Sequence, residues 1–168
     1  NFQTRSRQEA SEESRRCFLS ARHTSQNTHH TQERTGIPPM KAYLILEDGT
    51  VFTGTSIGSQ REVISEIVFN TSMTGYLEVL TDPSYAGQAV VMTYPLIGNY
   101  GICRQDMESL KPWPDGYIVR ELSRIPSNFR CEDTIQNFLE ENDIPGICGI
   151  DTRALTKLLR EKGTMNGM

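Results

Sequence analysis

An unbroken apolar run at residues 88–94 (QAVVMTY) constrains the fold of this chain more than any other feature. The run carries no charge, contains two adjacent β-branched valines and stops at Pro95. Such a pattern is typical of a strand buried inside a sheet, because a half-exposed strand alternates apolar and polar residues. We therefore expect a central buried strand in a layered domain.

Further strands are predicted on both sides of this run. Residues 42–46 and 51–53 flank the turn Glu47-Asp48-Gly49-Thr50, whose Asp-Gly pair predicts a β-hairpin. Residues 66–69 and 117–119 are expected to be strands, and residues 144–150 a short apolar strand interrupted by glycines.

Two helices are predicted late in the chain. Asp133 can cap a helix over residues 134–141, with Gln136 placed for a capping box. A second helix begins after the N-cap Asp151 and ends at the C-cap Gly163. These elements predict the α/β class, with mixed sheets, strands first and helices late.

The stretch from Phe69 to Tyr85 (FNTSMTGYLEVLTDPSY) is neither an ordinary strand nor a plain loop. Pro83 fixes φ at the second position of a turn, and the Asp82 side chain can accept a hydrogen bond from the following backbone. The Ser84 hydroxyl is then rigidly presented to solvent. We expect the apolar residues of this stretch to pack inward and its polar residues to form an exposed rim.

The first 39 residues differ in composition from the rest of the chain. They hold six Arg, four Glu and all three His, with few large apolar residues. Such a segment cannot bury enough apolar surface to offset the entropy of ordering, so we expect a disordered leader. Its Arg and Ser content suggests an organellar transit peptide, whereas its glutamates argue against one. The alternative is non-native sequence ahead of a start at Met40, with residues 40–168 as the folded domain.

Charge and cysteine content exclude several classes of function for residues 40–168. Eleven Lys and Arg stand against seventeen Asp and Glu, a net charge of −6, which argues against binding nucleic acid. The cysteines at 17, 103, 131 and 148 have no CxxC spacing, so neither a zinc site nor a redox motif is supported. Their scatter is typical of reduced thiols in a cytoplasmic protein. No apolar run reaches the ~18 residues of a membrane span.

Two sequence patterns resemble catalytic elbows but lack their partners. Residues 54–58 match G-x-S-x-G around Ser56, and Cys148 lies between glycines without the G-x-C-x-G spacing. No histidine follows His30, so neither nucleophile has a general base. No P-loop motif is present. Taken alone, the residues indicate a non-catalytic module that presents a polar loop.

Four motifs, in this order and spacing, together resemble one enzyme family. They are LEDGTVFTG at 46–54, VFNTSMTGYLEVLTDPSYAGQ at 68–88, TYPLIGNYG at 93–101 and GIDTRALTKLLREKG at 149–163. The combination resembles the N-terminal domain of the small, glutamine-hydrolysing subunit of carbamoyl phosphate synthetase. The resemblance covers residues 40–168 and implies a three-layer β/β/α fold.

The resemblance implies a function shared with parts that this sequence lacks. The family's small subunit continues into an amidotransferase domain with a Cys nucleophile and a His-x-Glu pair, which is absent from this sequence. The parent protein would hydrolyse L-glutamine and pass ammonia to the large subunit. That subunit would use ATP, Mg and bicarbonate to make carbamoyl phosphate for the arginine and pyrimidine pathways. The fragment itself would need no cofactor and have no glutaminase activity.

The resemblance also assigns one site residue. In the family, the serine of the D-P-S-Y turn reaches the glutamine site, and that position is Ser84 here. For the contact with the large subunit, we expect the helix face that carries Arg153, Lys157 and Arg160. Two rival hypotheses are a stand-alone interaction or scaffold module of the same fold, and a hydrolase that uses Ser56 or Cys148.

Overall fold

The computed structural model describes residues 40–168, so the expectations for residues 1–39 lie outside the described residues. The described strands are β1 (Lys41–Ile45), β2 (Val51–Gly58), β3 (Ser65–Asn70), β4 (Gln88–Met92), β5 (Leu96–Ile97), β6 (Gly116–Ile118), β7 (Glu121–Leu122), β8 (Pro145–Cys148) and β9 (Met165–Gly167). The helices are α2 (Tyr76–Thr81), α3 (Ile135–Glu141) and α4 (Thr152–Lys162), with short 3₁₀ turns η1 (Pro83–Tyr85) and η2 (Arg104–Asp106).

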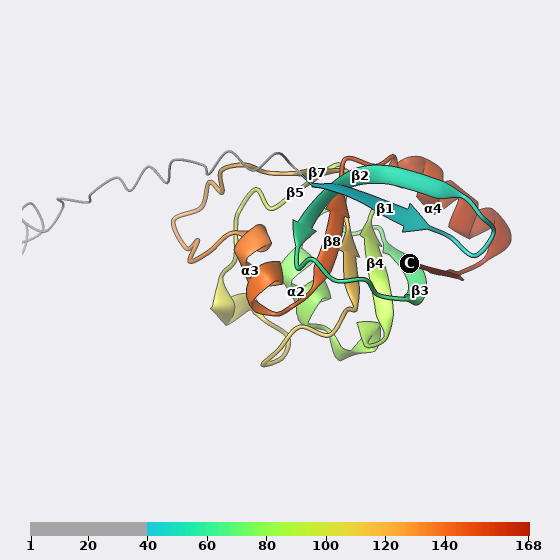
Figure 1. Cartoon of the computed structure of the whole chain (residues 1–168). Helices are drawn as coiled ribbons and strands as arrows, with labels where there is room; N and C mark the ends of the chain where they lie inside the picture. The colour runs from blue at the N-terminus through green and yellow to red at the C-terminus, as the bar shows by residue number, and fades with distance from the viewer. Residues whose placement is uncertain (1–39) are drawn as a thin grey trace, which may run out of the picture. The chain divides into compact units, whose positions relative to one another are not determined.

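Seven strands form one mixed sheet in the order β1-β2-β8-β6-β4-β3-β9. The four central strands, β8, β6, β4 and β3, run parallel to one another. The outer strands β1, β2 and β9 pair in antiparallel fashion with their neighbours. A bridge between Leu46 and Gly167 then joins the two ends, so the sheet curls until its edges meet (Figure 1).

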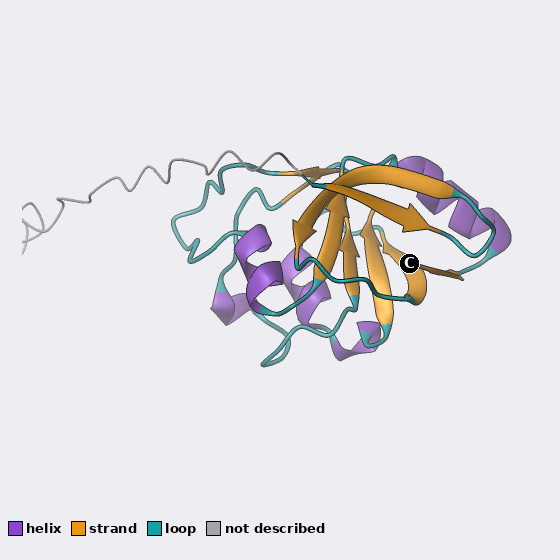
Figure 2. Ribbon diagram, in the orientation of Figure 1, coloured by secondary structure: helices purple, strands orange, loops and turns teal. Residues whose placement is uncertain are grey.

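The curled sheet separates two apolar cores. The inner core contains Leu44, Ile67, Val91 and Ile118, and it is completed by leucines from α4. The outer core lies between the other face of the sheet and helices α2 and α3 (Figure 2). The central strand β4 contributes to both cores because Val90 and Val91 point to opposite faces. This explains its unbroken apolar sequence.

The predicted α/β class, with a mixed sheet and a hairpin at its start, is confirmed. β1 and β2 pair across the predicted Asp-Gly turn, with Ile45 opposite Val51. Gly49 has φ of 83°, a conformation that glycine adopts without strain. The strands predicted around residues 66–69, 88–94 and 117–119 are β3, β4 and β6.

The start of α3 differs from the prediction by one residue. Thr134, not Asp133, is the N-cap, and its side chain accepts a hydrogen bond from the Asn137 amide. Asp133 instead accepts from the Thr134 amide at 2.7 Å. Gln136 donates to Glu140 one turn on, at 3.1 Å, so it does not form the predicted capping box. The extended backbone of Thr134 explains the change, because it brings the hydroxyl over the first free amides.

Candidate functional site

The turn that carries Ser84 is held by its own first residue. The Asp82 carboxylate accepts a hydrogen bond from the Ser84 amide at 2.8 Å, as the sequence predicts. Pro83 begins the 3₁₀ turn η1, which closes with the Ala86 amide donating to the Pro83 carbonyl at 3.1 Å. Ser84 itself is exposed. A hydroxyl on a fixed backbone can both donate and accept a hydrogen bond, so this position suits a polar ligand.

The segment before this turn contains a helix, α2, that no local sequence pattern predicts. Its N-terminal residue Gly75 lies at φ of 79° and provides no side-chain cap. Instead, the Tyr100 hydroxyl accepts hydrogen bonds from the amides of Gly75 and Tyr76, at 2.8 and 3.2 Å. The rings of Tyr76 and Tyr100 stack with their centroids 4.1 Å apart. A side chain 25 residues away in sequence therefore caps α2.

Tyr76 is buried in the outer core, and the partly buried Tyr100 packs against the same core. The Tyr76 hydroxyl donates to the Gly101 carbonyl at 2.7 Å. Burial raises the pKa of Tyr76, and burial also raises the pKa of Tyr100. Both rings therefore remain neutral over the physiological range and serve as hydrogen-bonding groups, not as bases.

The polar residues of the stretch 69–85 do not form one continuous rim along its length. Residues 71–74 follow the carboxyl end of β3, whereas Ser84 precedes the amino end of β4, which runs parallel to β3. Asn70 connects the two parts, because its side-chain amide donates to the Tyr85 hydroxyl at 2.9 Å. The predicted inward packing is confirmed for the apolar residues Tyr76, Leu77, Val79 and Leu80, but it is wrong for Met73, which is 70% exposed.

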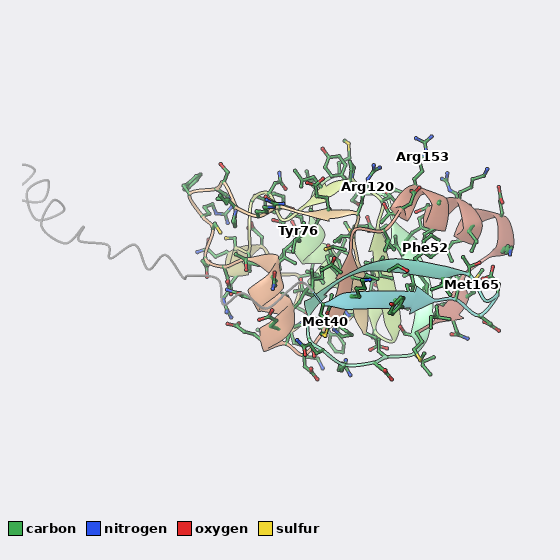
Figure 3. The ribbon with its side chains drawn as sticks, turned by 45° about the horizontal axis from the view of Figure 1, so that its top comes forward. Met40, Phe52, Tyr76, Arg120, Arg153 and Met165 are labelled. Carbon is green, nitrogen blue, oxygen red and sulfur yellow. The ribbon has the colours of Figure 1, made fainter. Side chains whose placement is uncertain are left out.

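Helix α4 presents the basic face that the sequence predicts. Asp151 caps the helix by accepting from the Arg153 and Ala154 amides, at 3.1 and 3.0 Å. Arg153, Lys157 and Arg160 are exposed, and Figure 3 shows Arg153 pointing away from the body of the domain. Lys157 lies 3.8 Å from Glu161, an ion pair that is worth little at an exposed site. The Arg160 guanidinium lies 5.8 Å from the centre of the Phe69 ring.

The structure does not bring this basic face and Ser84 together. α4 packs its leucines into the inner core, whereas Tyr85, next to Ser84, packs against the outer core. The two candidate surfaces therefore belong to opposite faces of the sheet.

The two possible nucleophiles lie in strands, not in elbows. Ser56 is within β2, which continues to Gly58 without the turn into a helix that a nucleophile elbow requires. Cys148 ends β8, and burial raises the pKa of its thiol, which disfavours the reactive thiolate. Among residues 40–168, no group of three or more potential ligands is placed to hold a metal ion. Within the same residues, no helix is long and apolar enough to cross a membrane.

A cavity of about 380 Å³ on the inner side of the curled sheet was not predicted. Its walls come from β1, β3, β6 and β8 and from residues 59–63, which lie far apart in the sequence. Sequence patterns predict which face of a strand is apolar, but they do not show where apolar faces leave a space.

Comparisons with known proteins identify the family. Residues 44–168 match the family described as "Carbamoyl-phosphate synthase small chain, CPSase domain". The carbamoyl phosphate synthase small chain of Oceanobacillus iheyensis is 59% identical over 128 residues, which are 76% of this chain and 35% of the relative. That of Clostridium perfringens is 60% identical over 129 residues, 77% of this chain and 37% of the relative.

A third relative is named for one pathway. The carbamoyl phosphate synthase pyrimidine-specific small chain of Halalkalibacterium halodurans is 58% identical over 128 residues, 76% of this chain and 35% of the relative. This chain thus spans about a third of the length of the curated relatives it matches. With the family match covering most of its length, the chain belongs to the carbamoyl-phosphate synthase small chain family, within the CPSase domain.

Proposed function

We propose that this domain completes the glutamine site of a glutamine-dependent carbamoyl phosphate synthetase without carrying out the hydrolysis itself. The reactive Cys, His and Glu belong to the amidotransferase domain of the full-length subunit. Ammonia released there passes to the large subunit, which uses ATP, Mg and bicarbonate to form carbamoyl phosphate. The carbamoyl phosphate formed supplies arginine and pyrimidine synthesis. A cytoplasmic location is part of the same proposal, supported by the scattered cysteines.

The geometry of Ser84 is the observation that carries the proposal. Its hydroxyl is exposed, and the Asp82 carboxylate and Pro83 fix the backbone that presents it. Because the turn is already formed, little further ordering is needed when a ligand binds, and this favours affinity. A hydroxyl suits both the ammonium and the carboxylate of an amino acid, since it can accept from the first and donate to the second.

The exposed face of α4 supports a second part of the proposal, docking on the large subunit. Arg153 and Lys157 project from a domain whose residues 40–168 carry a net charge of −6. A localised positive face on an acidic domain can orient its approach to an acidic partner surface. This face and Ser84 belong to opposite faces of the sheet, so one surface can contact the large subunit while the other faces the glutamine site.

Replacing Ser84 by Ala in the full-length subunit, bound to its large subunit, tests the proposal. We expect kcat/KM for glutamine to fall about 10- to 150-fold, because one hydrogen bond to a charged ligand is worth about 1.5–3 kcal/mol. Synthesis driven by added ammonia bypasses the glutamine site and should not change. The measurement is carbamoyl phosphate formation with each nitrogen source in turn.

Ser72→Ala is the matched control, because Ser72 is also exposed but lies at the opposite end of the β3–β4 pair. It should leave the rate of carbamoyl phosphate formation unchanged with glutamine and with ammonia. Equal losses with glutamine and ammonia in Ser84→Ala would show a defect of folding or assembly. Unchanged glutamine kinetics in that variant would refute the assignment of Ser84.

A further inference from the structure

The curled sheet leaves a gap between β1 and residues 59–63, directly beyond the end of β9. β9 lies between β3 and β1, because Gly167 pairs with Ser65 on one side and with Leu46 on the other. β9 ends at Gly167, but β1 extends four residues farther along the same direction, from Leu44 back to Lys41. Residues 59–63 form the opposite wall. Figure 1 shows the C-terminal end of the described chain between β1 and β3.

The β1 edge of this gap carries backbone groups that face it. Met40 accepts a hydrogen bond from the Ser56 amide at 2.8 Å, so alternate residues from Met40 point their backbone groups toward β2. Ile45 faces the other way and exchanges two hydrogen bonds with Met168, at 2.8 and 2.9 Å. By the same alternation, Tyr43 and Lys41 present their amides and carbonyls to the gap. An open strand edge of this kind is a template for pairing with another strand.

The 380 Å³ cavity lies behind the gap. It is lined by the inward side chains of β1 and of the central strands, among them Ala42, Leu44, Ile67 and Ile118. Ser65, only 5% exposed, lines the same cavity, and its hydroxyl has no hydrogen-bond partner. Because this space is open on one side and lined largely by apolar side chains, a further segment of chain can bury apolar surface there.

We propose that the gap is the binding slot for one more strand, formed by the segment that directly follows residue 168 in full-length small chains of this family. The inference rests on the family membership, because the relatives are about three times as long as the matched region. Met168 already pairs with Ile45, so the next residue enters the slot without a turn. Because this segment is joined directly to β9, its pairing with β1 costs no loop-closure entropy. A strand from a distant part of the chain would have to pay that entropy.

The existing registers fix how this segment lies. Continuing the antiparallel pairing of β9 with β1 places the second residue after Met168 opposite Tyr43. Gly167 points inward, since a Cβ there would lie 2.9 Å from Ile67 and 3.2 Å from Leu46. Side chains alternate along a strand, so the first and third added residues point into the cavity and the second and fourth point outward. The slot thus accepts an alternating strand that is apolar on its inner face.

Two designed extensions of the 168-residue chain test this proposal. The first adds Ile-Thr-Val-Thr after Met168, which puts the apolar side chains in the cavity. The second adds Thr-Ile-Thr-Val, a matched control of the same composition with every side chain on the opposite face. We expect the first extension to slow hydrogen exchange of the Tyr43 amide at least about tenfold and to raise the urea midpoint. The Leu44 amide faces β2 and is already hydrogen-bonded, so its exchange should change much less than that of the Tyr43 amide.

Equal exchange of the Tyr43 amide with and without the first extension would overturn the proposal. So would equal stabilisation by both extensions, because the cavity would then play no part. Protection of Tyr43 that appears only when the large subunit is added to the 168-residue chain would assign the slot to a partner strand instead. The experiment involves no glutamine, so its failure would leave the Ser84 proposal untouched.

Discussion

Among single residues, Tyr100 matters to the Ser84 segment because its hydroxyl caps α2, the helix that precedes the Ser84 turn. The hydroxyl accepts from two amides at the start of α2, where Gly75 provides no cap. Tyr100→Phe keeps the stacked ring but leaves both amides without an acceptor. We expect the free energy of unfolding to fall by about 1–3 kcal/mol, measured by urea denaturation.

Tyr43→Phe is the control for this substitution, because the Tyr43 side chain is exposed and its residue is 57% accessible. It should change the free energy of unfolding by less than about 0.5 kcal/mol. Equal effects of the two substitutions would show that the Tyr100 hydroxyl does not stabilise α2.

A second residue-scale prediction concerns Asp48 in the hairpin turn. Its carboxylate accepts from Lys162 at 2.8 Å and from the Thr50 amide at 2.9 Å, and these bonds lower its pKa from 3.8 to about 2. Because the folded pKa is depressed, the stabilisation is present above about pH 4 and is lost as pH falls through 2. Asp48→Asn should therefore destabilise the domain at pH 5, and the difference from the parent chain should shrink as the pH approaches 2.

NMR titration of the Asp48 carboxyl measures the same effect directly. Lys162→Met should return the pKa part of the way toward 3.8, because the largest cause of the shift is the bond to Lys162. A normal pKa in the parent chain would show that this contact between the hairpin and α4 does not form in solution.

Among helices and strands, the sequence predicts the ones that are specified by residues close together in the chain. The Asp-Gly turn, the apolar run of β4 and the Asp151 cap each specify an element from neighbouring residues, and all three are confirmed. Helix α2 was missed because its cap comes from Tyr100, which no local pattern indicates. The Ser84 turn was predicted from Asp82 and Pro83, whereas its connection to Asn70 through Tyr85 depends on the packed β3–β4 pair.

The element-scale prediction concerns the basic face of α4. Arg153→Glu combined with Lys157→Glu should weaken binding of the full-length small subunit to the large subunit by at least about tenfold at low salt. High salt should reduce the difference, because exposed charges are screened. The helix should remain folded, since an acidic residue at position 153 in its first turn is favoured by the helix dipole. The like charges that Lys157→Glu sets beside Glu161 cost only about 0.2–0.5 kcal/mol. The measurement is the dissociation constant at two ionic strengths.

Arg124→Glu, compared with Arg153→Glu alone, provides a control of equal charge change, because Arg124 is exposed but lies outside α4. It should leave the dissociation constant within about twofold of the parent value. If both variants bind equally well, the basic face of α4 is not the docking surface.

At the scale of the whole molecule, the domain is a scaffold with two separate outward surfaces. Its inner core joins the hairpin to α4, and its outer core joins the Ser84 segment to α2 and α3. Neither Ser56 nor Cys148 has the surroundings of a nucleophile. These observations agree with the proposed division, in which this domain presents Ser84 and the rest of the full-length subunit carries out the hydrolysis.

Ammonia release from glutamine by the isolated 168-residue chain tests this division of labour most directly. The chain alone should release no ammonia above the rate without protein, whereas the full-length subunit with its large subunit should release it steadily. Sustained release by the isolated chain, abolished by Ser56→Ala or Cys148→Ala, would contradict the account.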